Sequence, residues 1–331
     1  MKDIKIAIGC IVQWYEVEMY HEYVQSVINA VNFSDSKDSI IVDLCFYMSE
    51  NIEQLDTELI TKDEIYKKFQ NTERLFIDNN INFNVRYYDS DKIYTIADYR
   101  REFNDKYCQE VDVLMWGESD ALLPKETFQI LNILHQTNSV NGTNKYISFF
   151  GTNKMWDDTW LPIEYTNATD KPFLGKEDAK NWWGVSYITN LDELYDINGE
   201  ITELDVQRVY PYKFNGCGLV ISSDVVKSGV NIPRSILLVH EDTAFQNSLI
   251  KFFNGNVPQF IIKNVYLAHN RRHPKKRLYV KGESIISDIS QRRASNDWYK
   301  RVWQFDHDQA HNLWSMIPMM TWQDVFNQTH N

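Results

Sequence analysis

The sequence predicts an α/β fold in which helices flank a mixed, mostly parallel sheet, with a helical extension at the C-terminal end. Three observations support this. Apolar, β-rich runs alternate with helical patterns through the first half of the chain. The composition is 43% hydrophobic and 14% aromatic, as in a packed globule. The last part of the chain is rich in tryptophan, a residue whose large ring is usually buried.

The first half contains four expected strands, and a helical pattern follows each of them. The strands are Ile4–Val12, Ile40–Tyr47, Ile81–Tyr88 and Val111–Trp116. Apolar residues recur at helical spacing in the segments Tyr20–Val31, Thr61–Asn79, Tyr99–Tyr107 and Pro124–His135. Thr61 and Glu64 have the spacing of a capping box, and Pro124 is expected to begin its helix. Strands that alternate with helices favour a largely parallel sheet.

The second half is less regular. Its expected strands are Tyr146–Phe150, Phe214–Ile221 and Phe260–Ala268, and Glu241–Phe253 has a helical pattern. Residues 151–211 show no clear period. From Asp297 the tail carries Trp298 and further tryptophans, and we expect it to cover the sheet as helices. We therefore predict one domain over residues 1–273, with 151–211 as an insertion that shapes acceptor choice, and a basic, aromatic extension over 274–331.

The cysteines and the apolar runs bear on the cellular compartment. No apolar run approaches the length of a membrane span, so we expect no stable membrane insertion. The N-terminal residues do not resemble a signal peptide. The four cysteines lie far apart in the sequence, and no pair has metal-ligand spacing. We expect reduced core thiols and a cytoplasmic protein.

Charge is distributed unevenly along the chain. The net charge is −12, yet residues 269–303 contain ten Lys or Arg and three Asp or Glu, a local balance of +7. The body of the chain is therefore strongly acidic and carries one basic segment. Such a segment is typical of contacts with phosphates, although a solvated surface has the same composition.

Glu118-Ser-Asp120 is the most informative segment. It follows an apolar strand, and ligands of open α/β sheets bind beyond the carboxyl ends of the strands. Two carboxylates at that place can bind Mg²⁺ or Mn²⁺, which then bridges a diphosphate. A solvated acidic loop is the alternative.

Three later motifs join this acidic turn. The glycines of Asn215-Gly-Cys-Gly218 allow a ligand to approach the backbone closely. Glu241-Asp242 stands where a helix begins, a favourable place for carboxylates, and a simple helix cap is the alternative. His269 comes just after an expected strand, where it is either a metal ligand or a structural histidine.

In this order the motifs resemble the family-2-like glycosyltransferases of the GT-A, Rossmann-like fold. The resemblance covers roughly residues 4–273. The positions that match the family motifs are Arg100, Arg101 and Asn104 on the helix before the acidic turn, Glu118 and Asp120 for the Asp-x-Asp motif, Gly216 and Gly218 for the glycine strand, Glu241 and Asp242 for the acidic pair, and His269 for the late histidine. The chain departs from the family where the first acid is Glu118. It also lacks the acidic pair that often follows the second strand.

The resemblance implies transfer of a sugar such as glucose or arabinose from a nucleotide-sugar, with a UDP-sugar favoured, and with inversion. Asp242 would then be the general base and Glu241 would position it. Mn²⁺ or Mg²⁺ would be held by Glu118, Asp120 and His269. Arg100, Arg101, Asn104, Glu118, Gly216 and Gly218 would line the donor site, with Arg100 or Arg101 on the diphosphate or else on a solvated helix face. In a retaining enzyme Asp242 would have another role.

The basic segment suggests an acceptor. Its first part contains Arg271, Arg272, Lys275, Lys276 and Arg277. A soluble transferase with such a stripe beside His269 resembles the phage enzymes that glycosylate 5-hydroxymethylcytosine in duplex DNA. The modified base would leave the stack, and Trp182, Trp183 or Trp298 would stack on it. The alternatives are an acceptor on a surface glycan or lipid-linked oligosaccharide, and a non-catalytic protein that binds sugar nucleotides.

Overall fold

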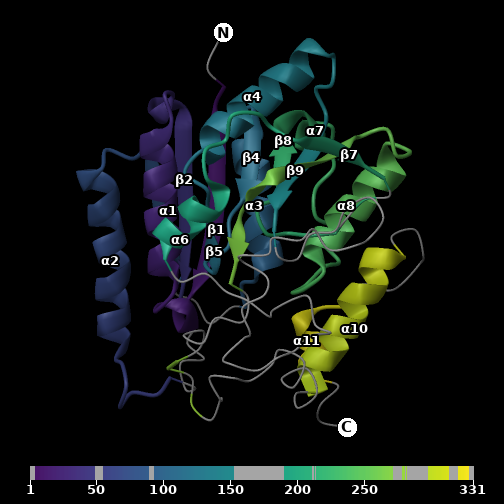
Figure 1. Ribbon diagram of the computed structural model, residues 1–331. Helices are drawn as coiled ribbons and strands as arrows, with labels where there is room; N and C mark the ends of the chain where they lie inside the picture. Colours follow the sequence, from purple (N-terminus) through teal and green to yellow (C-terminus); the bar gives the residue numbers. More distant parts are fainter. Residues whose placement is uncertain are drawn as a thin grey trace, which may run out of the picture.

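The computed structural model describes residues 4–48, 55–88, 93–152, 190–210, 212, 214–270, 278–279, 281, 297–312 and 320–327. Within these ranges the chain forms an eight-stranded sheet with helices on both faces and a separate two-stranded ribbon (Figure 1). The mixed α/β fold expected from the sequence is confirmed. None of the described helices is both long and apolar enough to span a bilayer.

The large sheet has the strand order β3-β2-β1-β4-β8-β6-β9-β7. Its strands are β1 (Ile6–Gln13), β2 (Ile40–Tyr47), β3 (Phe83–Tyr88), β4 (Val113–Trp116), β6 (Ile147–Gly151), β7 (Val206–Val209), β8 (Val220–Ser222) and β9 (Gln259–Tyr266). β3, β2, β1 and β4 are parallel, and so are β6 and β9. β8 and β7 run antiparallel to their neighbours.

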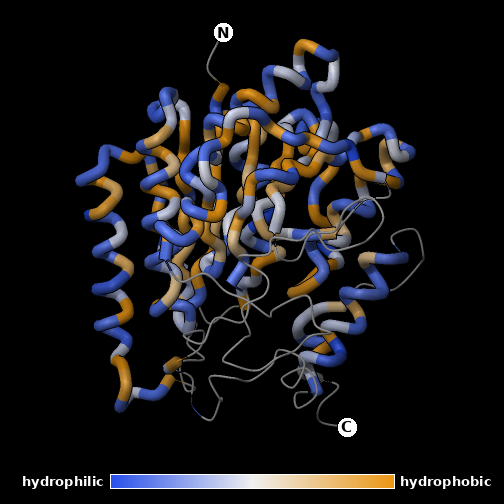
Figure 2. Tube along the Cα trace, in the orientation of Figure 1, coloured by the Kyte–Doolittle hydropathy of each residue, from blue (hydrophilic) through white to orange (hydrophobic). Residues whose placement is uncertain are grey.

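Two hydrophobic cores lie on the two faces of this sheet. Alternate residues of a strand point to opposite faces, so Ile6 and Ile8 enter one core while Ala7 and Ile11 enter the other. The helices of the first core are α1 (Tyr20–Phe33), α2 (Lys62–Asp78) and α4 (Thr127–Val140), and those of the second are α3 (Ile96–Tyr107), α7 (Ser223–Lys227) and α8 (Glu241–Phe252). Figure 2 shows hydrophobic residues concentrated in the central strands between these layers.

Helix α2 shows how local sequence determines the start and the buried face of a helix. The Thr61 side chain accepts a hydrogen bond from the Glu64 backbone, and the Glu64 side chain accepts one from the Thr61 backbone, so the expected capping box is present. The Glu64 carboxylate accepts hydrogen bonds from both the Thr61 backbone N–H and the Thr61 hydroxyl, and these two bonds favour its ionised form and lower the pKa of Glu64. Ile65, Phe69 and Phe76 are fully buried along one face, which holds the helix against the sheet.

Two predicted boundaries are wrong. The strand expected over Phe214–Ile221 is reduced to Val220–Ser222, because a turn precedes it in which Gly218 adopts φ +67°. The helix expected from Pro124 begins at Thr127, whose backbone N–H and hydroxyl both donate to the Pro124 carbonyl. That hydrogen-bonded turn fills the place of the first helical turn.

The C-terminal tail contains the expected helices α10 (Asp297–His311) and α11 (Trp322–Asn327). They lie together at one end of the molecule, with α10 packed against α8 (Figure 1). Buried Asp306 of α10 accepts hydrogen bonds from three successive backbone amides, those of residues 237–239, at 2.8–2.9 Å. The tail therefore supports the loop that leads into α8. The domain limits at 273 and 151–211 stay predictions, and residues 153–189 lie outside the described ranges.

Candidate functional site

The chain segments that contain the sequence motifs lie together at one edge of the sheet, where the parallel strands end. β1, β4, β6 and β9 run in the same direction, so their carboxyl ends meet at this edge. β8 runs in the opposite direction and therefore begins there, directly after Asn215-Gly-Cys-Gly218. Such an edge is where open α/β sheets bind ligands.

The acidic turn meets His269 through a short ribbon. β5 (Ala121–Leu122) follows the turn and pairs antiparallel with β10 (Ala268–His269), with His269 opposite Ala121. The Asn270 backbone N–H also donates to the Asp120 carbonyl at 2.7 Å. As a result, His269 Nε2 lies 2.9 Å from Glu118 Oε2 and 3.7 Å from Asp120 Oδ1. The three residues expected to bind metal thus lie together.

Arg100 connects this group to helix α8. Its guanidinium is 2% exposed and lies 2.8 Å from Glu118 Oε1 and 2.5 Å from Glu241 Oε1. It also stacks on the Trp116 ring at 4.6 Å and donates to the Gly216 carbonyl at 3.3 Å. Both ends of the guanidinium are bound to carboxylates, so Arg100 positions Glu118 and Glu241. Its expected contact with a diphosphate stays a prediction.

The acidic pair begins helix α8, as predicted. Glu241 is buried, whereas Asp242 is half-buried and its Oδ1 accepts a hydrogen bond from the Thr243 backbone at 2.6 Å. The backbone of Gly216 passes between Arg100 and Asp242. A Cβ atom at Gly216 would lie 2.6 Å from Arg100 Nη1 and 3.2 Å from Asp242 Cβ. Asp242 is therefore on the same side of the molecule as the acidic turn.

The site contains more acidic than basic side chains. Glu118, Asp120, Glu241 and Asp242 bring four carboxylates beside the guanidinium of Arg100 and the imidazole of His269. Burial disfavours the charged form of Glu118, but the hydrogen bonds and charges of His269 and Arg100 outweigh it and hold the pKa of Glu118 well below its usual range.

Glu241 shows the opposite shift. Burial raises the pKa of Glu241 to about 7, against the effect of Arg100, and the neighbouring carboxylates of Asp242 and Glu118 add to the rise. Buried excess negative charge is relieved either by a proton or by a cation. The carboxylate and imidazole donors of Glu118, Asp120 and His269 therefore fit a divalent cation.

Two residues of α3 that we expected to bind the nucleotide-sugar make hydrogen bonds with other parts of the protein. Arg101 donates to the carbonyls of Ile232, Pro233 and Ile236 and pairs with Asp98, so it fastens the loop before α8. Asn104 accepts from the Trp116 indole at 2.9 Å and donates to Asn231. Both are bound within the protein in this structure, and their place at the donor stays a prediction. Local packing explains why position 218 is glycine: φ is +67°, and an added Cβ atom would lie 2.8 Å from the Leu267 side chain.

The residues expected to contact the acceptor mostly lie outside the described part of the chain: Arg271, Arg272, Lys275, Lys276, Arg277, Trp182 and Trp183. Trp298 lies at the start of α10, with its ring 6.0 Å from that of Trp322. These predictions remain untested by the structure.

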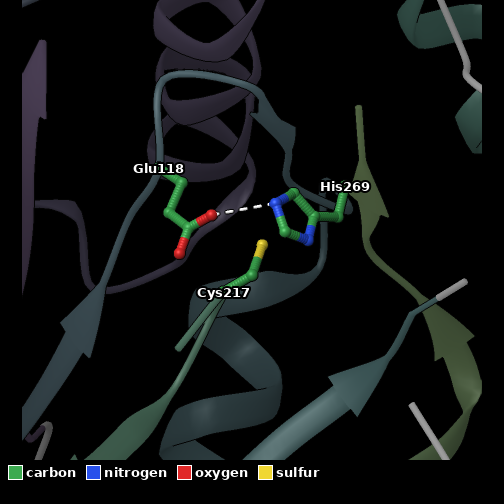
Figure 3. Close-up of side chains that lie close together, drawn as sticks. All are labelled: Glu118, Cys217 and His269. Carbon is green, nitrogen blue, oxygen red and sulfur yellow. Dashed lines mark ion pairs between the residues drawn. The ribbon is translucent and has the colours of Figure 1, made fainter. Parts of the chain in front are cut away.

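The structure adds two residues that the sequence analysis did not assign to the site. Glu16, in the 3-10 turn after β1, accepts a hydrogen bond from the Ser119 hydroxyl at 2.6 Å and so holds the acidic turn. Its position just after the first strand was a usable signal. Cys217, interpreted as a core thiol, points toward Glu118 and His269 (Figure 3). Its position between the two glycines of the Asn215-Gly-Cys-Gly218 motif could have indicated that it belongs to the site.

Comparison with known proteins gives no family. No family model matches the chain, and no curated protein does. Among solved structures, it aligns with a UDP-glucose pyrophosphorylase in complex with UDP-glucose, at 9% identity and a TM-score of 0.36 over 78% of this chain and 90% of that one. A UTP-bound UGPase from Acinetobacter baumannii aligns at 12% identity and 0.35 over 78% and 86%. A 4-diphosphocytidyl-2C-methyl-D-erythritol synthase from Anaerococcus prevotii aligns at 10% identity and 0.33 over 78% and 88%. The function is therefore argued from the site itself.

Proposed function

We propose that this chain is a metal-dependent glycosyltransferase that uses a nucleotide-sugar donor, with a UDP-sugar favoured. The observation that supports this most is the grouping of Glu118, Asp120 and His269 at the carboxyl edge of the sheet, joined through Arg100 to the acidic pair of α8. This combines oxygen and nitrogen donors for a cation with an accessible carboxylate nearby, the parts that sugar transfer from a diphosphate needs.

Each residue has a distinct part in the proposed reaction. Glu118, Asp120 and His269 would hold a divalent cation, which neutralises the charge of a leaving diphosphate when bound. Arg100 donates a hydrogen bond to each of Glu118 and Glu241 and so keeps both carboxylates in place. Gly216 leaves room at the backbone between Arg100 and Asp242.

Asp242 is the proposed general base. It is half-buried, whereas Glu241 is buried and bound to Arg100, so Asp242 is the carboxylate of the pair that an acceptor hydroxyl can reach. A positioned carboxylate that takes the proton of the attacking hydroxyl supports direct displacement, which inverts the anomeric carbon. Glu241 then acts by fixing the start of α8.

A donor screen tests the proposal. The protein is incubated with a panel of nucleotide-sugars, with and without divalent metal, and both thermal shift and slow release of nucleoside diphosphate are followed. We expect one class of donor to stabilise the protein only with metal and to be hydrolysed slowly. Asp120→Asn should lose metal-dependent donor binding, whereas Asp242→Asn should bind donor and lose turnover.

The same screen separates the alternatives. Formation of nucleoside triphosphate after pyrophosphate is added would identify a nucleotidyltransferase and refute glycosyl transfer. Donor binding without any turnover, unchanged by Asp242→Asn, would identify a non-catalytic sugar-nucleotide-binding protein.

For the acceptor we propose 5-hydroxymethylcytosine in duplex DNA. The proposal rests on the basic composition of residues 271–277, next in sequence to His269. Labelled sugar should pass to hydroxymethylated duplex and not to the same unmodified duplex, and binding should weaken steeply with salt. Neutralising Lys275, Lys276 and Arg277 should reduce that salt dependence. Transfer to glycan or lipid-linked acceptors alone would refute the DNA acceptor.

A further inference from the structure

Three donor atoms of different chemistry converge at the acidic turn. The Cys217 sulfur, a Glu118 carboxylate oxygen and a ring nitrogen of His269 all lie within 4.8 Å of one another, and among the described residues they are the one such group of three (Figure 3). They come from three elements: the turn after β4, the turn before β8, and β10. Cys217 is 1% exposed and His269 6%, whereas the Glu118 side chain is 19% exposed, so the group is mostly buried with Glu118 on its accessible side.

The backbone fixes the position of the sulfur. The Asn215 side-chain oxygen accepts a hydrogen bond from the Cys217 backbone N–H at 3.2 Å. Gly216 and Gly218 flank it, each in a place where a Cβ atom would lie under 3.0 Å from a neighbouring side chain. The backbone on both sides of Cys217 is therefore held in place, and a ligand on a preorganised backbone costs little to bring to a metal.

We propose that Cys217 is a protein ligand of the cation at this site, together with Glu118 and His269. The expectation of Mg²⁺ or Mn²⁺ came from carboxylates, the donors that hard cations prefer. A thiolate, an imidazole and a carboxylate instead form a set typical of zinc. The cation is therefore of the Zn²⁺ or Co²⁺ class.

The number of ligands agrees with a functional site. Catalytic zinc sites use three protein ligands and keep a fourth position for water or substrate, whereas structural sites use four. Cys217 thereby takes the ligand place that the proposed function gives to Asp120, whose Oδ1 lies 3.7 Å from the same His269 nitrogen and outside the trio. The role of this cation at a donor diphosphate rests on the proposed function, but its coordination does not.

Cobalt spectroscopy tests the ligand set without a donor. The full chain is stripped of metal and titrated with Co²⁺. We expect one Co²⁺ per chain, strong visible bands of four-coordinate cobalt, and a near-ultraviolet band from thiolate-to-cobalt charge transfer. Zn²⁺ should displace the cobalt stoichiometrically, and a large excess of Mg²⁺ should not.

Two variants sharpen the titration. Cys217→Ser should lose the near-ultraviolet band and bind Zn²⁺ at least about tenfold more weakly, as expected when one of three ligands is lost. Cys45→Ser, which changes another fully buried thiol, should keep the band and the affinity. X-ray absorption of the zinc-loaded wild type needs no variant and should find one sulfur at about 2.3 Å.

The outcomes separate this proposal from the proposed function. Cobalt bound without the thiolate band, a zinc shell without sulfur, or no metal bound in the absence of donor would each overturn the role of Cys217. A positive donor screen would then leave the glycosyltransferase proposal standing. If the metal site contains sulfur but the protein neither binds nor turns over any nucleotide-sugar, the ligand set is supported and the glycosyltransferase proposal is refuted.

Discussion

Arg100 lies 2.5 Å from Glu241, and this contact joins the acidic turn after β4 to the start of helix α8. The guanidinium is almost completely buried and also binds Glu118 at 2.8 Å. Glu241 is buried and the Glu118 side chain is only 19% exposed, so each carboxylate depends on this cation for compensation. The two halves of the candidate site are therefore electrostatically coupled through one side chain.

The first prediction concerns this coupling. Arg100→Gln leaves Glu118 and Glu241 without their cation, and breaking a buried pair costs about 3–5 kcal/mol of unfolding free energy. Urea denaturation measures that loss, and the donor assay should show activity reduced to background. Lys227→Gln is the control: its pair with Asp224 is 37% and 47% exposed, so the cost should stay within about 1 kcal/mol with activity kept. Equal losses in the two variants would refute the coupling.

The second prediction concerns Gly216. In Gly216→Ala the new methyl would lie 2.6 Å from Arg100 Nη1 and must displace the guanidinium or the backbone. We expect activity to fall at least about tenfold, since a displacement near 1 Å at an active site has effects of this size or larger.

Gly142→Ala provides the matched control for that substitution. Gly142 has φ +74° and no atom within 4 Å of an added Cβ, so only backbone strain results. We expect a loss of about 1 kcal/mol in stability with activity unchanged. If Gly216→Ala behaves like Gly142→Ala, the packing around Arg100 tolerates the methyl group.

The fold and the site differ in how far the sequence determines them. β2 was predicted with its observed limits, Ile40–Tyr47, and helix α1 was predicted from the apolar spacing of Tyr20–Val31, because both follow local periodicity. The ribbon between β5 and β10 was missed. Each of its strands has two residues, too few for a periodic signal, and it exists only because two distant segments pair.

The site residues follow the same division. Their residue types and order along the chain indicated Glu118, Asp120 and His269 as a group. The position of Arg100 could not be read in that way, because its partners lie 18 and 141 residues away and neighbouring Arg101 has the same chemistry. Adjacent residues of a helix point about 100° apart, so Arg100 faces the carboxylates while Arg101 faces the carbonyls of residues 232, 233 and 236.

The third prediction concerns Asp306 of α10. Its carboxylate accepts three backbone N–H bonds from residues 237–239, which lead directly into Glu241 and Asp242. Asp306→Asn keeps one acceptor oxygen and turns the other into a donor that faces N–H groups. We expect a loss of about 2–4 kcal/mol in stability, from the strength of hydrogen bonds to charged groups.

The effect of Asp306→Asn on turnover follows from that loop. We expect kcat to fall several-fold with little change in the KM for the donor, because the base is misplaced while the metal ligands are not. Asp308→Asn is the control on the same helix, since among the described residues the half-exposed Asp308 side chain pairs with Gln304 and His307 at the surface. A normal kcat in Asp306→Asn, with the expected loss of stability, would show that α10 does not position Asp242.

The last prediction concerns pH and Glu241. Burial raises the pKa of Glu241 from its ordinary value of 4.5 to about 7. Between these values the folded chain holds a proton that the unfolded chain has released, so the stability from this group is full below 4.5 and is lost as pH rises to about 7. Gln at position 241 does not titrate. Between about pH 5 and about pH 8, the unfolding free energy of Glu241→Gln should therefore fall less than that of the wild type, and the two falls should differ by at most about 3 kcal/mol.

Urea denaturation at the two pH values measures this. Glu58→Gln, at an exposed acid between β2 and α2, should behave like the wild type. If Glu241→Gln does so too, Arg100 keeps Glu241 ionised throughout this range.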